Sequence, residues 1–197
     1  MRCFVIIKYN HTIYIMLSHS GSMFSRAIKK CSKDPYTHVS IALDEHLYEL
    51  YSFGRIKPYN PIIGGFVKED IVNGTYRRFP ETKCAIYSLD ISDEQYRRLK
   101  KELNKFKRAS KQYKYNLIGV VSAAFNKPIH RQHSYFCSQF VSEILQNSGI
   151  RLIDKDPGLT SPMDFSRCNE LLCIYEGELK AISNGGLNNQ VFLDINV

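Results

Sequence analysis

The sequence predicts an α+β fold in which an antiparallel sheet packs against a helix that carries Cys137 in its first turn. Short β-branched runs occur in pairs around tight turns, which is typical of antiparallel strands. Two longer segments carry apolar residues at spacings of three and four, which is typical of helices packed on one face. The chain has 197 residues, 44% of them hydrophobic, so residues 1–197 are expected to form a single domain with a sizeable core.

The N-terminal segment is predicted to start with two strands. Residues 3–7 and 12–17 are short apolar runs, and the polar residues 8–11 between them indicate a turn. A short helix is expected over residues 23–31, where apolar residues recur at helical spacing. Asp34-Pro35 then ends this helix, because proline cannot continue it.

A β-hairpin is predicted next. Residues 38–43 alternate as a half-buried strand should, and residues 47–53 run back as its partner after a tight turn at residues 44–46. This pairing would place His38 and Glu49 on neighbouring antiparallel strands.

The middle of the chain is predicted to hold a loop, two strands and a helix. Residues 54–65 are rich in Pro, Gly, Asn and Tyr, and the length of this loop suggests that it covers something. Strands are expected over residues 75–79 and 84–89. A helix is expected from about residue 92 to residue 110, because Ser92 can cap the first free N–H groups and acidic residues follow in the first turn.

This helix is cationic and amphipathic. Its apolar face comprises Tyr96, Leu99, Leu103 and Phe106, and its basic residues are Arg97, Arg98, Lys100, Lys101, Lys105, Lys107 and Arg108. The simplest interpretation is a solvated outer face, and the alternative is a binding surface for an anionic polymer or a membrane. The net charge of +8 favours anionic partners without identifying one, and no specific nucleic acid is indicated.

The C-terminal third is predicted to contain a buried helix with Cys137 in its first turn. Apolar residues recur at helical spacing from position 136 to position 145, and Gly149 lies just beyond the end of the pattern. Less regular segments surround this helix: an apolar helix over residues 116–125, a polar loop over 126–134, a Pro-containing linker over 156–162, a short helix or strand over 168–175 and a weak strand over 190–195.

Cys137 has the sequence context of a nucleophile. The free N–H groups and the positive end of the helix dipole stabilise a thiolate in the first turn. A cysteine nucleophile also needs a base and a group that orients the base, and His38 and Glu49 could supply these roles. His130 and His133 are rival bases, but a strand holds an imidazole in place better than a loop does, so His38 is preferred.

The remaining cysteines suggest neither a metal site nor a disulfide framework. The six cysteines are scattered without a CxxC pair, so reduced thiols and a cytoplasmic location are expected, with no cofactor and no metal. No run approaches the ~20 consecutive apolar residues of a transmembrane helix, and the polar residues from Lys8 onward argue against a signal peptide.

Two segments carry a resemblance to a known family. Residues 37–44 (THVSIALD), followed by Glu49 and then by residues 135–141 (YFCSQFV), resemble the circularly permuted papain-like amidases. This branch of the NlpC-type superfamily includes the YiiX-like and lecithin:retinol acyltransferase-like proteins. In it the histidine strand precedes the cysteine helix, as in this chain. The resemblance extends to Tyr115-Asn116 and to residues 161–165, and so covers about residues 12 to 175.

The resemblance implies a cysteine-dependent hydrolase or acyltransferase that acts on an amide, peptide or ester bond through a thioester. Cys137 would be the nucleophile, His38 the base and Glu49 the residue that orients His38. The Cys137 N–H would stabilise the oxyanion, with Tyr115 or a loop amide as a candidate second donor. The substrate would be a peptide, an amide or a lipid ester. The alternative is a non-catalytic binding module in which the helix over 93–110 and the loop over 54–66 hold an anionic polymer or membrane surface.

Overall fold

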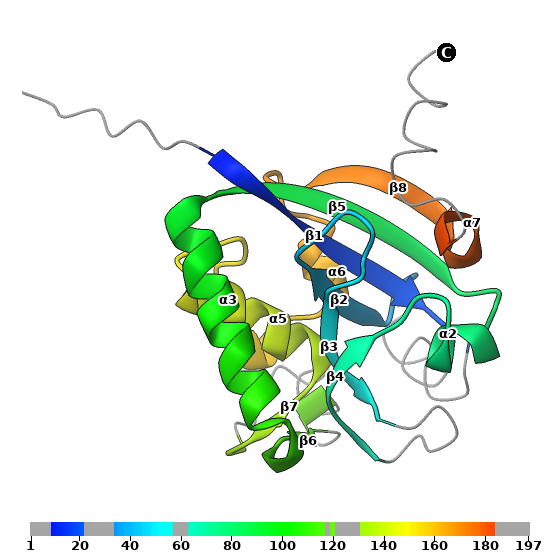
Figure 1. The fold of residues 1–197 in the computed structure, drawn as a ribbon, viewed down its shortest axis with the longest axis horizontal. Coiled ribbons are helices and arrows are strands. Elements are labelled where there is room, and N and C mark those ends of the chain that lie inside the picture. The colour runs from blue at the N-terminus through cyan, green and yellow to red at the C-terminus, as the bar shows by residue number, and fades with distance from the viewer. Residues whose placement is uncertain (1–8, 22–33, 57–62, 117–118, 121–130, 184–197) are drawn as a thin grey trace, which may run out of the picture.

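The computed structural model describes residues 9–21, 34–56, 63–116, 119–120 and 131–183 (Figure 1). Several predicted features lie outside these residues: the strand over 3–7, the helix over 23–31, most of the helix over 116–125, the strand over 190–195, and the side chains Cys3, Cys31 and His130.

The fold is mixed α+β and is centred on a six-stranded antiparallel sheet, as the sequence predicts. The strand order is β4-β3-β2-β1-β5-β8, with bounds β1 (Tyr9–His19), β2 (His38–Ala42), β3 (Leu50–Arg55), β4 (Gly64–Glu69), β5 (Lys83–Ser92) and β8 (Leu172–Glu178). The short strands β6 (Lys114–Tyr115) and β7 (Ser134–Tyr135) form a separate parallel pair.

Helices lie on both sides of the sheet (Figure 1). The long helices α3 (Asp93–Arg108) and α5 (Cys137–Asn147) cover one face, whereas the short helices α2 (Gly74–Arg78) and α7 (Leu179–Ser183) cover the other. The short helical turns η1 (Ser110–Gln112), η2 (Pro157–Leu159) and α6 (Pro162–Phe165) join these elements.

Each face of the sheet has its own apolar cluster, because successive residues of a strand point to opposite faces. The first cluster joins the sheet to α3 and α5 and includes Ile15, Val39, Ile41, Phe53, Leu99 and Phe140. The second cluster joins the sheet to α2 and α7 and includes Met16, Ala42, Leu50, Tyr76, Ile86 and Leu179. Polar groups on the second face are therefore buried as well.

The predicted hairpin forms, but its turn is longer than expected. The Asp44 carboxylate accepts hydrogen bonds from the N–H groups of His46, Tyr48 and Glu49 at 3.1, 3.0 and 2.6 Å. An aspartate that collects backbone N–H groups in this way stabilises a turn in place of strand pairing. The returning strand β3 consequently begins at Leu50, and Glu49 lies in the turn.

Three other predictions of local structure are wrong. Residues 9–11 belong to β1 and pair with β5, where a turn was expected, because a bulge between Tyr9 and His11 lets the strand continue. The loop expected over 54–65 is shorter, since β3 runs to Arg55 and β4 begins at Gly64. The strand expected over 75–79 is the helix α2, which starts at Gly74 with a φ of 61°.

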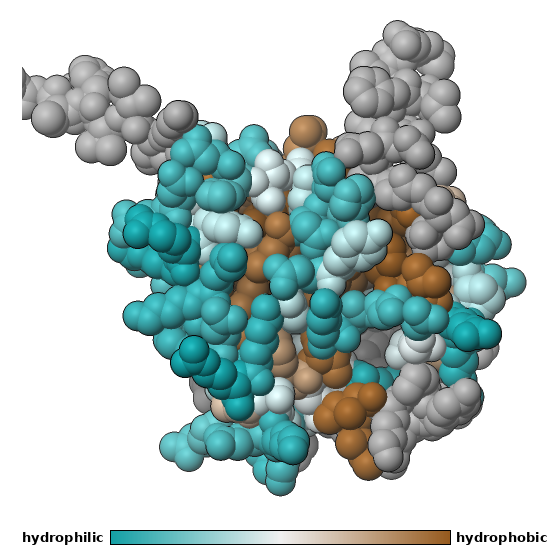
Figure 2. Space-filling model, viewed as in Figure 1, coloured by the Kyte–Doolittle hydropathy of each residue, from teal (hydrophilic) through white to brown (hydrophobic). Residues whose placement is uncertain are grey.

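The helix α3 forms as predicted. Ser92 and Gln95 make a reciprocal capping box at its start, and Leu99, Leu103 and Phe106 are buried. Its basic side chains are mostly exposed and form part of the hydrophilic surface over this helix (Figure 2). Within the described residues, the structure contains no helix with both the length and the apolar character needed to cross a bilayer.

The capping box gives a test of the fold. Ser92→Ala removes the side-chain acceptor for the N–H of Gln95 and should lower the free energy of unfolding by about 1 kcal/mol. Chemical denaturation measures this change, with Asn104→Ala on the exposed side of the same helix as the control. Equal losses in the two variants would contradict the role of the cap.

Candidate active site

Cys137 is the first residue of α5, which places its sulfur at the N-terminal end of a buried helix. The preceding residue, Phe136, makes no side-chain cap, so the N–H groups of the first turn face the sulfur and its surroundings. The N–H groups of Val39 and Ser138 hydrogen-bond the sulfur. Cys137 is only 4% exposed, which shields a charge on the sulfur from bulk water.

His38 is the first residue of β2 and contacts two functional side chains. Its Nε2 atom lies 2.7 Å from Oε1 of Glu69, and its ring is also hydrogen-bonded to the side chain of Cys137. Because Nε2 faces the carboxylate, Nδ1 is the ring nitrogen left for the sulfur. Cys137, His38 and Glu69 thus form a continuous hydrogen-bonded chain from thiol to imidazole to carboxylate.

Glu69 ends β4 and is surrounded by hydrogen-bond donors. Its Oε2 atom accepts from the hydroxyls of Ser40 and Tyr76 at 2.8 and 2.7 Å. Its Oε1 atom accepts from Ser52 as well as from His38. The carboxylate side chain is 10% exposed, so these donors replace most of its water.

The prediction that Glu49 orients His38 is wrong. Leu43 donates its backbone N–H to the carbonyl of Glu49, which places Glu49 five residues along the hairpin from His38. At the rise of a strand this separation is about 16 Å, too far for a hydrogen bond. Glu49 instead accepts from the hydroxyl of Tyr51 at 3.0 Å and lies 3.7 Å from Nζ of Lys107.

Sequence reasoning missed Glu69 because the start of its strand fell in the loop expected over 54–65 and no strand was predicted over residues 66–69. A signal was nevertheless present in Ser40 and Ser52, which fall at inward positions of the two predicted strands. Buried serines need hydrogen-bond partners, so both predict a polar group on that face of the sheet.

The charges of this site are mutually stabilised. Burial acts to lower the pKa of His38, but the Glu69 carboxylate and the Cys137 sulfur raise it to about 10. Burial acts to raise the pKa of Glu69, but His38, Ser52 and Tyr76 lower it to about 2. Burial also acts to raise the pKa of Cys137, but His38 and the two N–H groups outweigh burial and bring it below its ordinary value. Cys137 and His38 therefore each stabilise the charged form of the other, the thiolate and the imidazolium.

The other described cysteines lack this environment. Burial raises the pKa of Cys84 to about 12 and that of Cys168 to about 11, in each case with nearby carboxylates adding to the effect. Burial also raises the pKa of the Cys173 thiol. Among the cysteines that the structure describes, Cys137 has the lowered pKa, so it is the thiol expected to react first.

Tyr115 brings a phenol to the same sulfur. Its hydroxyl is hydrogen-bonded to Cys137, and burial together with the charge of Cys137 raises its pKa well above the ordinary value. The phenol therefore remains a neutral donor beside the Cys137 sulfur. Gly64 permits this approach, because a Cβ atom there would lie 2.8 Å from Cβ of Tyr115.

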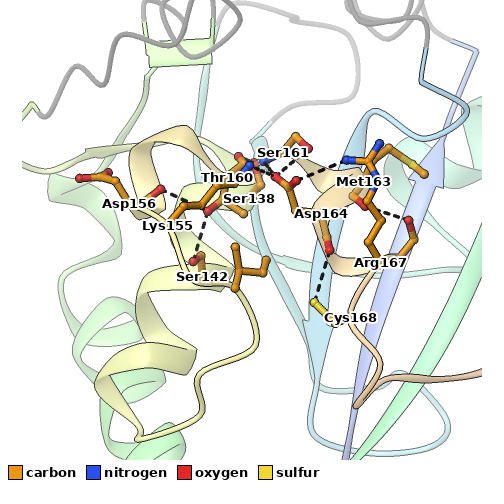
Figure 3. A network of polar contacts seen from close by, with 12 residues as sticks. Ser138, Ser142, Lys155, Asp156, Thr160, Ser161, Met163, Asp164, Arg167 and Cys168 are labelled. Atoms are coloured by element: carbon orange, nitrogen blue, oxygen red, sulfur yellow. Dashed lines mark hydrogen bonds and ion pairs between the residues drawn. The ribbon is translucent and has the colours of Figure 1, made fainter.

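A polar network fixes the first turn of α5 from the side of η2 and α6 (Figure 3). The hydroxyl of Ser138 donates to the carbonyl of Thr160 at 2.5 Å, and the Thr160 hydroxyl reaches Ser142 at 3.4 Å. Asp164 holds the start of α6, since it accepts a hydrogen bond from the N–H of Ser161 and forms an ion pair with Lys155 at 2.5 Å. Ser138, which follows Cys137, is thus anchored to the segment that contains η2.

The rival base His133 lies elsewhere. It is exposed and has its ring 5.7 Å from that of Tyr113, centroid to centroid. Within the described ranges, no cluster of three His, Cys, Asp or Glu side chains could hold a metal ion. The chain matches no protein-family model, and no curated protein matches it significantly.

The carboxylate at this site can be tested by the pH dependence of Cys137 alkylation with iodoacetamide. Glu69→Gln removes the charge that supports the His38 imidazolium and should raise the apparent thiolate pKa by about one unit or more. Glu49→Gln is the matched control and should leave the profile unchanged, because Glu49 contacts Tyr51 and Lys107 instead. A raised thiolate pKa in Glu49→Gln and an unchanged one in Glu69→Gln would instead assign the orienting role to Glu49.

Proposed function

We propose that this protein is a cysteine-dependent hydrolase or acyltransferase that acts on an amide, peptide or ester bond through a thioester. Cys137 would be the nucleophile and His38 the base, with Glu69 in the orienting role. The hydrogen-bonded chain of these three side chains at the start of α5 is the observation that carries the proposal. It also supports the resemblance to the permuted papain-like amidases, since the histidine strand precedes the cysteine helix.

The first step is attack by the thiolate. The Cys137 sulfur forms a bond to the carbonyl carbon of the substrate, and the carbonyl electron pair moves to oxygen. The Tyr115 hydroxyl and the N–H of Cys137 at the start of α5 are donors beside this position and can stabilise the oxyanion. The buried setting strengthens both interactions.

Collapse of this intermediate requires a proton for the leaving group. The His38 imidazolium donates it to the departing amine or alcohol, the bond to that group breaks, and the acyl group remains on Cys137 as a thioester. Neutral His38 then removes a proton from water or from an acceptor nucleophile, which attacks the thioester and restores the thiolate. Hydrolysis and acyl transfer differ only in that second nucleophile.

The Glu69 carboxylate supports both steps without exchanging a proton. It holds the imidazole so that one nitrogen faces the sulfur, and its charge stabilises the imidazolium that precedes each transfer. Its pKa of about 2 keeps it ionised throughout the neutral range.

Competitive alkylation with a peptide-level readout is the first test of the proposal. At pH 6 Cys137 should react with iodoacetamide at least about tenfold faster than Cys84, Cys168 and Cys173, because its thiolate is the most populated. His38→Ala should abolish this advantage. His46→Ala is the control, since His46 lies in the exposed turn of the same hairpin.

Slow labelling of Cys137 that His38→Ala leaves unchanged would overturn the enzyme proposal. It would favour the alternative of a non-catalytic module that uses the basic helix α3. A positive result is followed by treatment with p-nitrophenyl esters of increasing chain length, in which mass spectrometry should detect an acyl adduct on Cys137 that is absent from Cys137→Ser.

The role of Tyr115 gives a separate prediction. Tyr115→Phe should slow acylation by a p-nitrophenyl ester about 100-fold, since loss of one oxyanion donor has an effect of this order. Alkylation by iodoacetamide forms no oxyanion and should change only a few-fold. Tyr113→Phe, two residues earlier in the same segment, is the control and should retain both rates. Parallel losses in the two reactions of Tyr115→Phe would assign Tyr115 to the thiolate alone.

A further inference from the structure

The side chains around Glu69 supply hydrogen bonds to both oxygens of its carboxylate. Each carboxylate oxygen accepts two hydrogen bonds: Oε1 from His38 and Ser52, and Oε2 from Ser40 and Tyr76. The three donors other than His38 come from β2, β3 and α2. A carboxylate held at both oxygens from three elements cannot rotate, so Oε1 has a fixed direction toward His38.

These polar side chains occupy positions where apolar residues would otherwise pack. Ser40 and Ser52 are fully buried, and Tyr76 is 7% exposed. Their neighbours on this face include Ala42, Leu50 and other members of the second apolar cluster. Burying a carboxylate among such residues costs folding free energy. Replacing a buried ion pair by apolar side chains often leaves a protein equally stable or more stable, so a role other than stability is expected for Glu69.

The connection between β4 and α2 brings the Tyr76 hydroxyl back to the Glu69 carboxylate. The chain leaves β4 at Glu69, turns at Asp70, which accepts from the N–H groups of Val72 and Asn73, and enters α2. Seven residues after Glu69, the Tyr76 hydroxyl lies 2.7 Å from its Oε2 atom. The Tyr76 hydroxyl also contacts Ser18 of β1, so its position is fixed on a second side.

We propose that Tyr76 is a positioning residue of the active site, which acts through Glu69 on His38. Its hydroxyl, with that of Ser40, holds Oε2 so that Oε1 stays directed at the imidazole. This inference rests on the proposed function for its catalytic meaning, but the geometry it describes can be measured without any substrate.

Among the residues that the structure describes, His38 faces Glu69 from β2, Tyr76 faces it from α2, and Cys84 of β5 lies near the phenol. On its other side His38 faces Cys137 of α5. Burial and the Glu69 charge raise the pKa of Tyr76 well above its ordinary value, so the phenol donates throughout the accessible pH range.

The test is an NMR titration of His38 in the full chain, with isotope-labelled histidine and assignment by His38→Ala. In Tyr76→Phe the ring still packs, but the carboxylate is free to turn away from the imidazole. The pKa of His38 should then fall by about half to one unit, the size expected for one hydrogen bond. Alkylation of Cys137 at pH 6 should slow several-fold as its counter-ion weakens.

The matched control is Tyr51→Phe. This variant also removes a hydrogen bond from a buried tyrosine to a glutamate, but to Glu49, which lies in the turn between β2 and β3 and does not contact His38. Its His38 titration should match that of the wild type. Ser40→Ala removes the other donor to Oε2 and provides a second variant in case Tyr76→Phe unfolds, which a thermal unfolding scan detects; it should also lower the pKa of His38.

The direction of the shift decides the proposal. If the phenol only shares the charge of a carboxylate that stays in place, its removal raises the pKa of His38, and that result, or no change, overturns the positioning role. Failure of the proposed function has a different signature, namely a wild-type Cys137 that forms no acyl adduct while the His38 titration still responds to Tyr76→Phe.

Discussion

The ion pair between His38 and Glu69 constrains much of the surrounding structure. A carboxylate removed from water loses several kcal/mol of hydration unless other groups replace it. Here the replacement comes from β2, β3 and α2, each of which contributes a polar side chain at a position facing an apolar cluster. One charge therefore accounts for the buried polar side chains of these three elements. The same charge favours the imidazolium of His38, which in turn lowers the pKa of Cys137.

The positions of Cys137 and His38 were predictable because their signals are local. Helical spacing fixes the start of α5 near Cys137, and strand alternation fixes His38 at the start of β2. The carboxylate was not predictable in this way. Asp44 converts the expected start of β3 into a turn by accepting three backbone N–H groups, which moves Glu49 out of the sheet. Choosing the nearest acidic residue on the returning strand consequently gave the wrong partner.

The strand that does carry the carboxylate was hidden by its composition. Two glycines open β4, and glycine is uncommon inside strands, so residues 64–69 have the pattern of a loop. The structure explains both: a side chain at Gly64 would meet Tyr115, and one at Gly65 would approach the carbonyl of Tyr113 at 2.9 Å. Close packing between β4 and the β6 segment is a tertiary requirement, and it overrides local strand propensity.

The two halves of the candidate site are braced independently. Ser138 and Thr160 fix the sulfur from the side of η2, within the cluster that contains α5, whereas Glu69 and Tyr76 fix the imidazole from the cluster on the opposite face. The distance between the Cys137 sulfur and the His38 ring therefore depends on how α5 lies against the sheet. A small sliding of α5 over the sheet would change that separation, together with the distances from the sulfur to the Val39 N–H and the Tyr115 hydroxyl, while leaving the hydrogen bonds around Glu69 in place.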